Sequence, residues 1–189
     1  MANPNTPFGF RPIIRAGGAP FSVNEYGKPS GDSNAIFAFD LVQKVASATP
    51  LPEAGLPYNL PGVQTGYTAT PGTTLWLGAS LSYGAPSVAS VHPVADEVDV
   101  VYIAQAKTGV AITTAAHVGK NANVSLTQAG NALTKMSRMA VDSGTIAATA
   151  TLDLRILRVS MISPNAEGDS AILEVSINKH WAGLQTAGT

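Results

Sequence analysis

The sequence contains no cysteine. Disulfide bonds, thiolate metal sites and cysteine nucleophiles are therefore excluded. No run of apolar residues approaches the ~20 that a membrane-spanning helix needs. The first residues, Met1 to Phe8, have neither the positive charge nor the apolar stretch of a signal peptide. We therefore expect a protein that is made in the cytoplasm, stays there until it joins a larger structure, and binds no membrane.

Charged residues are also scarce. Asp, Glu, Lys and Arg make up 12% of the chain, where a soluble domain has about 25%. Ala, Thr, Ser and Gly take their place, which favours a surface that packs against partners; a monomer with a hydroxyl-rich surface is the alternative. The net charge of −1 provides no field that would attract nucleic acid. The 189 residues, 45% of them hydrophobic, are enough for the core of one domain.

The first 33 residues combine helix-breaking prolines with apolar side chains that disordered tails usually lack. We interpret residues 1–33 as an extended, mildly basic N-terminal arm that is ordered by lying on another surface. Packing of the arm on its own domain, residues 34–189, is the alternative. The residues expected to contact a partner are Pro7, Phe8, Phe10, Arg11, Pro12, Ile13, Arg15 and Phe21, together with Trp76 and Trp181 as packing or interface anchors.

The rest of the chain has the alternating pattern of short β-strands and no convincing helical period. A Pro-rich loop at residues 50–72 is either a binding loop or hides a strand near Val63 to Thr68. The pattern predicts an all-β fold, an antiparallel sandwich or barrel of jelly-roll type, with a β-tulip as the alternative. The predicted strands are residues 35–45, 74–83, 87–91, 97–106, 110–113, 123–126, 137–141, 152–162 and 170–178.

The last two predicted strands are the best defined. Their sequences predict an antiparallel hairpin around the turn at residues 164–169. In the strand at residues 152–162 the apolar alternation slips by one position, which predicts a β-bulge between Ile156 and Leu157. In the strand at 170–178, alternate residues point inward: Leu173, Val175 and Ile177. Arg155 and Arg158 are expected either to pair with a cross-strand acid such as Glu174 or to form salt bridges between subunits.

The sequence offers no set of catalytic residues. His92, expected in a turn before Pro93, has no zinc-ligand spacing to His117 or His180. The acidic cluster Asp96, Glu97 and Asp99 is interpreted as a solvated strand start, and Asp142-Ser143-Gly144 as a turn, not a nucleophile. No phosphate-binding loop is present. We therefore predict a protein that is not an enzyme and has no catalytic, cofactor-binding or metal residues and no small-molecule substrate.

Three segments resemble a family of structural cement proteins of tailed bacteriophages. The first is the opening motif Pro7-Phe8-Gly9-Phe10-Arg11-Pro12, followed by Gly18-Ala19-Pro20. The second is Gly119-Lys120-Asn121-Ala122. The third and most specific runs through Val141-Asp142-Ser143, Leu152 to Leu157 and Pro164 to Asp169, and ends at Val175 to His180. The stretch from Pro50 to Pro93 departs from the family's pattern.

The resemblance implies an all-β protein that clusters, often as homotrimers, on the outer face of the phage head. Such proteins bind the major capsid protein and clamp neighbouring subunits after the shell expands. From the Pro-rich yet aromatic composition of the arm, we expect that deleting Met1 to Ala19 leaves a folded domain that binds heads much more weakly. Two alternatives are another virion component, such as a head–tail connector or tail tube subunit, and, in a different class, an enzyme or carbohydrate-binding module.

Overall fold

A computed structural model describes residues 3–44, 60–183 and 188 of the chain. These residues form two antiparallel β-sheets, with few helical residues. The predicted all-β, antiparallel sandwich is therefore confirmed. Within the described residues, no helix is long and apolar enough to span a membrane.

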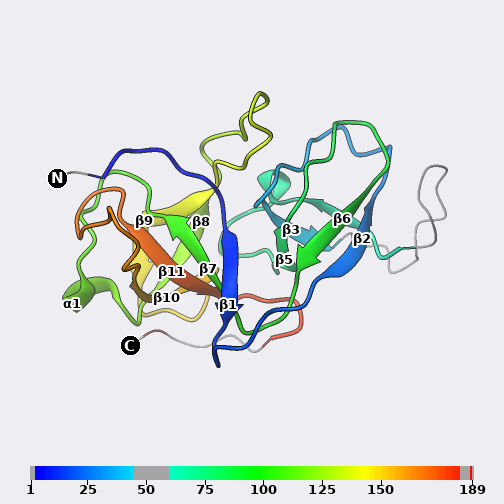
Figure 1. Cartoon of the computed structure of the whole chain (residues 1–189). Helices are drawn as coiled ribbons and strands as arrows, with labels where there is room; N and C mark the ends of the chain where they lie inside the picture. The colour runs from blue at the N-terminus through cyan, green and yellow to red at the C-terminus, as the bar shows by residue number, and fades with distance from the viewer. Residues whose placement is uncertain (1–2, 45–59, 184–187, 189) are drawn as a thin grey trace.

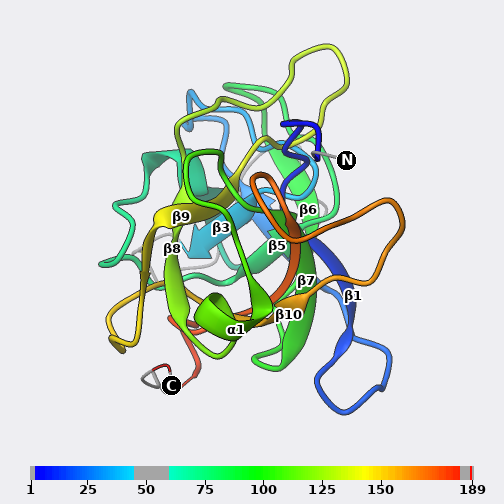
Figure 2. The ribbon, with the colours of Figure 1, turned by 90° about the vertical axis from the view of Figure 1, so that its left-hand side faces the viewer.

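The larger sheet has six strands in the order β1-β7-β11-β10-β8-β9 (Figures 1 and 2). The β1 strand is an edge strand, which suits Pro12 because proline cannot donate a ladder hydrogen bond. The strand bounds are Arg11–Arg15 for β1, Val100–Gln105 for β7, Asn121–Ser125 for β8, Ala140–Ala147 for β9, Leu154–Val159 for β10 and Ile172–Ile177 for β11.

The smaller sheet has five strands in the order β2-β6-β5-β3-β4. Its bounds are Asn24–Lys28 for β2, Leu41–Lys44 for β3, Val63–Thr65 for β4, Gly78–Ser80 for β5 and Ser90–Ala95 for β6. A 3-10 turn, η1, follows β4 at Gly66–Thr68, and a single helical turn, α1, spans Thr114–His117. The strand predicted inside the Pro-rich loop is thus β4, whereas residues 50–59 of that loop lie outside the described residues.

The main core lies between the two sheets. On the side of the smaller sheet it contains Trp76, Leu41 and Ala79. These side chains pack with the inward residues of the larger sheet, such as Tyr102 and Ile156. A second cluster covers the other face of the smaller sheet, around residues such as Val42 and Leu77. Because Leu41 faces one cluster and Val42 the other, β3 is apolar on both sides, which explains its unbroken hydrophobic start.

The predicted C-terminal hairpin is confirmed. The β10 and β11 strands pair antiparallel, and their register shifts between Ile156 and Arg158, where the bulge was predicted. Leu173, Val175 and Ile177 are buried as expected. Met161, however, is 88% exposed, because β10 ends at Val159 and the residues beyond it no longer follow the pleat.

Three predicted strands of the smaller sheet have different bounds. The strand predicted at residues 35–45 is interrupted because Phe39 has a φ of 70° and the Phe37 N–H donates to Asp40 Oδ2, which makes a turn. The strand predicted at 74–83 shortens to β5, since the Trp76 N–H donates to the Lys179 carbonyl instead. The third, predicted at 87–91, is β6.

The sequence around His92 was also predicted incorrectly. His92 and Pro93 lie within β6 and not in a turn. The β5 strand pairs only with Val94 and Ala95 of β6. Pro93 therefore lies beyond the end of β5, where its missing N–H is not needed for that pairing. The Pro93 carbonyl still accepts a hydrogen bond from the Leu81 N–H at 2.8 Å.

The N-terminal residues are extended and are built into the sheets of their own chain. The β1 strand pairs with β7, Arg11 opposite Ile103. The β2 strand pairs with β6, Glu25 opposite Pro93. The described part of the predicted arm therefore passes from one sheet to the other (Figure 1), and residue 33 marks no break between arm and domain.

Candidate functional site

Residues 3–6 lie beside the end of β7 and are held by hydrogen bonds. The Gln105 side chain accepts the Thr6 N–H at 2.9 Å and donates to the Pro4 carbonyl at 2.7 Å. Asn3 donates to the carbonyls of Ala166 and Asp169. These contacts fix the beginning of the described chain beside the turn at residues 164–169, so the motif that follows has a defined place on the surface.

Gly9 and Phe10 anchor the motif that the sequence singled out. The Phe10 side chain is fully buried in the main core, and its N–H donates to the Phe39 carbonyl at 2.9 Å. Gly9 has a φ of 79°, and a Cβ there would lie 2.5 Å from both Phe39 O and Ser137 Cβ. Only glycine fits this close passage, which brings the N-terminal segment against the loop that contains Ser137.

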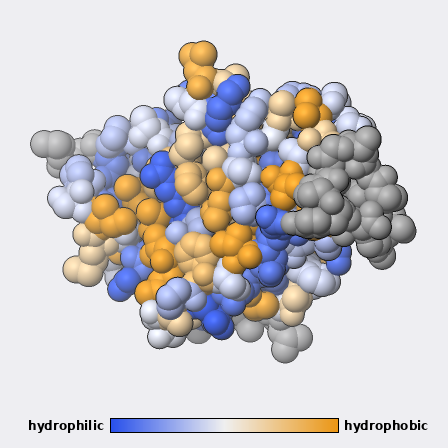
Figure 3. Space-filling view, turned by 45° about the vertical axis from the view of Figure 1, so that its right-hand side comes forward, coloured by the Kyte–Doolittle hydropathy of each residue, from blue (hydrophilic) through white to orange (hydrophobic). Residues whose placement is uncertain are grey.

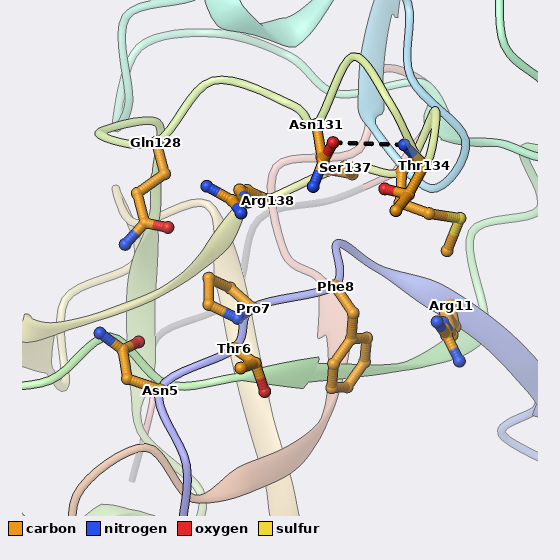
Figure 4. Close-up of a pocket in the computed structure, with 11 residues that line it drawn as sticks. Asn5, Thr6, Pro7, Phe8, Arg11, Gln128, Asn131, Thr134, Ser137 and Arg138 are labelled. Carbon is orange, nitrogen blue, oxygen red and sulfur yellow. Dashed lines mark hydrogen bonds between the residues drawn. The ribbon is translucent and has the colours of Figure 1, made fainter.

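A groove of about 280 Å³ lies between these two segments (Figure 4). In Figure 4 the N-terminal segment forms one wall and the loop before β9, residues 126–139, forms the other. The residues that line the groove are Asn5, Thr6, Pro7, Phe8 and Arg11 from the first segment, and Gln128, Asn131, Thr134, Met136, Ser137 and Arg138 from the second.

The groove contains two guanidinium groups and no carboxylate. The Arg11 guanidinium stacks on Phe8 and Phe39, with its carbon 4.9 and 5.1 Å from the two ring centroids. Arg138 is exposed, and its backbone N–H is held by the Tyr67 hydroxyl at 3.2 Å. Within the described part of the chain, neither guanidinium forms a salt bridge. The groove is therefore a cationic surface that a carboxylate fits.

Apolar side chains are exposed next to the groove, along the β1 edge. Ile13 and Ile14 are 40% and 36% exposed, because the bulge in β1 turns both away from the core. With Gly18, Pro20 and Phe21 they line a shallow hollow of about 400 Å³. Figure 3 shows apolar surface gathered on the lower half of one face of the molecule. Exposed apolar clusters of this kind mark contact surfaces in soluble proteins.

The acidic cluster at the start of β7 holds the N-terminal segment in place. The Arg15 Nε–H is shared between the two carboxylate oxygens of Asp99, each 3.0 Å away, and Glu97 accepts the Ser22 N–H. Asp96 accepts hydrogen bonds from Asn24 and Tyr26. The cluster that was predicted as a solvated strand start, Asp96, Glu97 and Asp99, thus forms an acidic clamp: it binds residues of β1, of β2 and of the segment that links them.

The predicted contact residues fall into four groups. Pro7, Phe8 and Arg11 line the groove, while Ile13 and Phe21 line the apolar hollow. Trp181 is 44% exposed and stacks under Lys44, and Pro12 and Arg15 are partly exposed. Phe10 and Trp76 are fully buried. The prediction of Phe10 as a contact residue is corrected, and of the two roles predicted for Trp76 the structure shows packing: both are core residues and offer no surface to a partner.

Sequence reasoning missed the second wall of the groove. Residues 127–136, between the strands predicted at 123–126 and 137–141, contain no alternating pattern, and their polar side chains are typical of any loop. In the structure this loop projects from the molecule (Figures 1 and 2), and Leu133 within it is 93% exposed. A large apolar side chain in a polar projecting loop is the one signal in the sequence that could have pointed to a contact site.

The buried polar clusters contribute to the interior of the fold. His92 contacts the hydroxyls of Ser80 at 3.0 Å, Ser82 at 3.2 Å and Ser90 at 2.9 Å, and it is fully buried. Burial lowers the pKa of His92 to about 4. Ser143 donates to the Lys107 carbonyl at 2.8 Å. Among the described residues, no three His, Asp or Glu side chains gather as a metal site.

Comparison of the chain with models of protein families, with curated proteins and with solved structures finds no match. No family membership therefore follows from these comparisons.

Proposed function

We propose that this chain is a structural protein of a tailed-phage virion. In this proposal it binds the outer surface of the expanded head and bridges neighbouring major capsid subunits, as a cluster of identical chains such as a homotrimer. The observation that carries the proposal is the position of the Pro7 to Pro12 motif. This motif is one of the three segments that carry the family resemblance, and three of its residues, Pro7, Phe8 and Arg11, line the groove at the surface.

Two further features agree with a role in assembly. The surface has few charges, since only 12% of the residues are charged, and charged residues are depleted at the centres of interfaces. Apolar side chains are exposed beside the groove, among them Ile13 and Ile14. Several such contacts reinforce one another when identical chains dock side by side on a repeating shell.

Co-sedimentation with purified phage heads tests the proposal. Expanded heads without decoration are mixed with increasing amounts of the protein, and unexpanded heads serve as the control. We expect saturable binding to expanded heads alone. Absence of binding to both forms would contradict the proposal and favour a connector or tail tube subunit, for which assembly into rings is then examined by electron microscopy.

A pair of surface variants makes the test specific for the proposed contact face. Ile13→Ser removes an exposed aliphatic side chain beside the groove, and Val88→Ser removes one from the loop between β5 and β6, where Val88 is 51% exposed. Burial of such a side chain contributes about 1.5–3 kcal/mol, so Ile13→Ser is expected to weaken binding about tenfold. Val88→Ser is expected to bind like the unchanged protein. Equal effects of both changes would place the contact face elsewhere.

The structure changes the truncation test that the sequence suggested. Deleting Met1 to Ala19 removes β1 from the larger sheet and Phe10 from the main core. Loss of a buried Phe side chain alone costs about 3–5 kcal/mol. The expectation that the remaining domain folds normally is therefore withdrawn, and point substitutions are the appropriate test.

A further inference from the structure

We infer that the groove between residues 5–11 and 128–138 binds an acidic, extended peptide segment. The inference deepens the proposed function, on which it rests for the identity of the partner, because it states the chemistry of the segment that the capsid would present. The binding itself is a property of the groove and is tested without heads.

The two guanidinium groups supply the charge recognition. Arg11 and Arg138 line the same groove from its two walls (Figure 4), and no acidic residue lines it with them. A guanidinium presents a planar fork of donors that matches a carboxylate, and stacking on Phe8 and Phe39 holds the Arg11 fork in one orientation. Less rotational freedom is then lost when an anion binds.

The remaining polar side chains match a peptide backbone. Asn5, Gln128 and Asn131 line the groove. The carboxamides of Asn5 and Gln128 each carry a donor and an acceptor, whereas the Asn131 oxygen already accepts the Leu133 and Thr134 N–H groups and leaves its NH₂ group to donate. An extended peptide presents N–H and C=O groups in alternation, so carboxamides can bond to both. A nucleic acid fits less well, because two cations on a chain of net charge −1 cannot neutralise a run of phosphates.

The shape of the groove limits the length of the segment. A volume of about 280 Å³ accommodates a few residues and no folded element. Pro7 and Phe8 provide an apolar surface between the two arginines in the view of Figure 4. A segment with two carboxylates separated by a small apolar residue meets all three features.

The probe is the peptide acetyl-Gly-Glu-Ala-Glu-Gly-amide, titrated into the full-length ¹⁵N-labelled protein and followed by two-dimensional NMR. The same peptide with Gln in place of both Glu residues has the same shape without the charge. We expect the Glu peptide to shift the amide signals of residues 5–11 and 128–138. The Gln peptide is expected to bind at least about tenfold more weakly, because charge-assisted hydrogen bonds are lost.

Three variants locate the binding. Arg11→Gln and Arg138→Gln each remove one guanidinium and are expected to weaken binding of the Glu peptide about tenfold. Lys135→Gln is the matched control, since it removes one positive charge from the same loop, at a residue that stacks on Tyr83 and does not line the groove. It is expected to bind within about twofold of the unchanged protein. If Arg11→Gln loses the dispersed spectrum of a folded protein, the exposed Arg138 alone decides the comparison.

The inference is overturned by any of four results: neither peptide binds, both peptides bind equally, sodium acetate at the same carboxylate concentration gives the same shifts with the same affinity, or glucuronate binds more tightly than the Glu peptide. The last result would assign the groove to an acidic sugar. Failure of the proposed function has a different outcome. A protein that binds the Glu peptide and no phage head has an acidic partner outside the capsid.

Discussion

At the scale of single residues, the interior contains two titratable groups, and their burial makes the stability of the fold depend on pH in opposite directions. His92 is surrounded by three serine hydroxyls, and Asp40 lies at the turn that interrupts the first predicted strand. Both are fully buried. Burial disfavours the charged form of both, so His92 resists gaining a proton and Asp40 resists losing one. The pH dependence of folding therefore distinguishes the two groups.

His92 is expected to destabilise the protein in acid. Burial, followed by the charge of Lys28, lowers the pKa of His92 to about 4. The folded state thus resists protonation that the unfolded state accepts near pH 6.5, and stability that is complete above pH 6.5 is lost as the pH falls toward 4. The difference is about 3 kcal/mol. Because the buried Asp40 titrates over the same range in the opposite direction, the contribution of His92 is measured as a difference between two proteins. From pH 7 to pH 4, the free energy of unfolding of the unchanged protein, measured by urea unfolding, should fall by about 3 kcal/mol relative to that of His92→Gln. An equal pH dependence of both proteins would disprove the assignment.

Asp40 is expected to act in the other direction. Burial raises the pKa of Asp40 to about 7, although the Phe37 N–H partly offsets the shift. The folded state therefore holds a proton that the unfolded state has released, so the free energy of unfolding falls as the pH rises from about 4 through 7. The full change is about 4 kcal/mol.

The matching variant is Asp40→Asn, which cannot ionise. Urea unfolding between pH 5 and pH 8 should lose this contribution in Asp40→Asn. It should retain it in Asp142→Asn, a change to a partly exposed carboxylate on β9. If the two variants have the same pH dependence, Asp40 is not the titrating group.

At the scale of elements, the acidic clamp determines how firmly the N-terminal segment is held. In the pair between Arg15 and Asp99, one Nε–H is shared by both carboxylate oxygens, and the side chains are 39% and 41% exposed. Partly exposed pairs contribute about 1 kcal/mol or less to global stability. Their effect should therefore be local, on the edge strand β1 and the link to β2.

Asp99→Asn is expected to speed hydrogen exchange at the amides of residues 11–24 and to leave the global free energy of unfolding within about 1 kcal/mol. Exchange is followed residue by residue by NMR. The control is Glu174→Gln, which breaks the Arg158–Glu174 pair, 2.7 Å long, between β10 and β11. Unchanged exchange in residues 11–24 of Asp99→Asn would show that the backbone pairing of β1 alone holds the segment.

At the scale of the whole molecule, the shared core predicts that the two sheets unfold together. Trp76 is fully buried and packs among residues of both sheets, whereas Trp181 is 44% exposed. In Trp181→Phe the remaining fluorescence reports on this shared core. Its urea transition should coincide with the transition of the circular dichroism of the strands. Two separate transitions would mean that the smaller sheet folds independently.

Much of the fold could be predicted from the sequence because it depends on local patterns. The alternation in residues 170–178 and the phase slip at Leu157 predicted β11, its inward face and the bulge in β10. Each signal involves neighbouring residues, and a buried face enforces it wherever the strand pairs. The low charge and the all-β class followed in the same way from composition and from the absence of a helical period.

The groove was decided by the tertiary structure alone. Its walls are residues 5–11 and 128–138, which meet because Gly9 passes between Phe39 and Ser137. The two strands of the N-terminal segment likewise depend on distant partners, β7 and β6. The prolines and aromatic residues of the N-terminal segment predicted an extended conformation. Which surface the segment covers depends on packing between parts of the chain that are far apart in the sequence, and local patterns do not encode such packing. The sequence by itself determined the class of fold and the residue types available for contact; their meeting in one groove was determined by long-range packing.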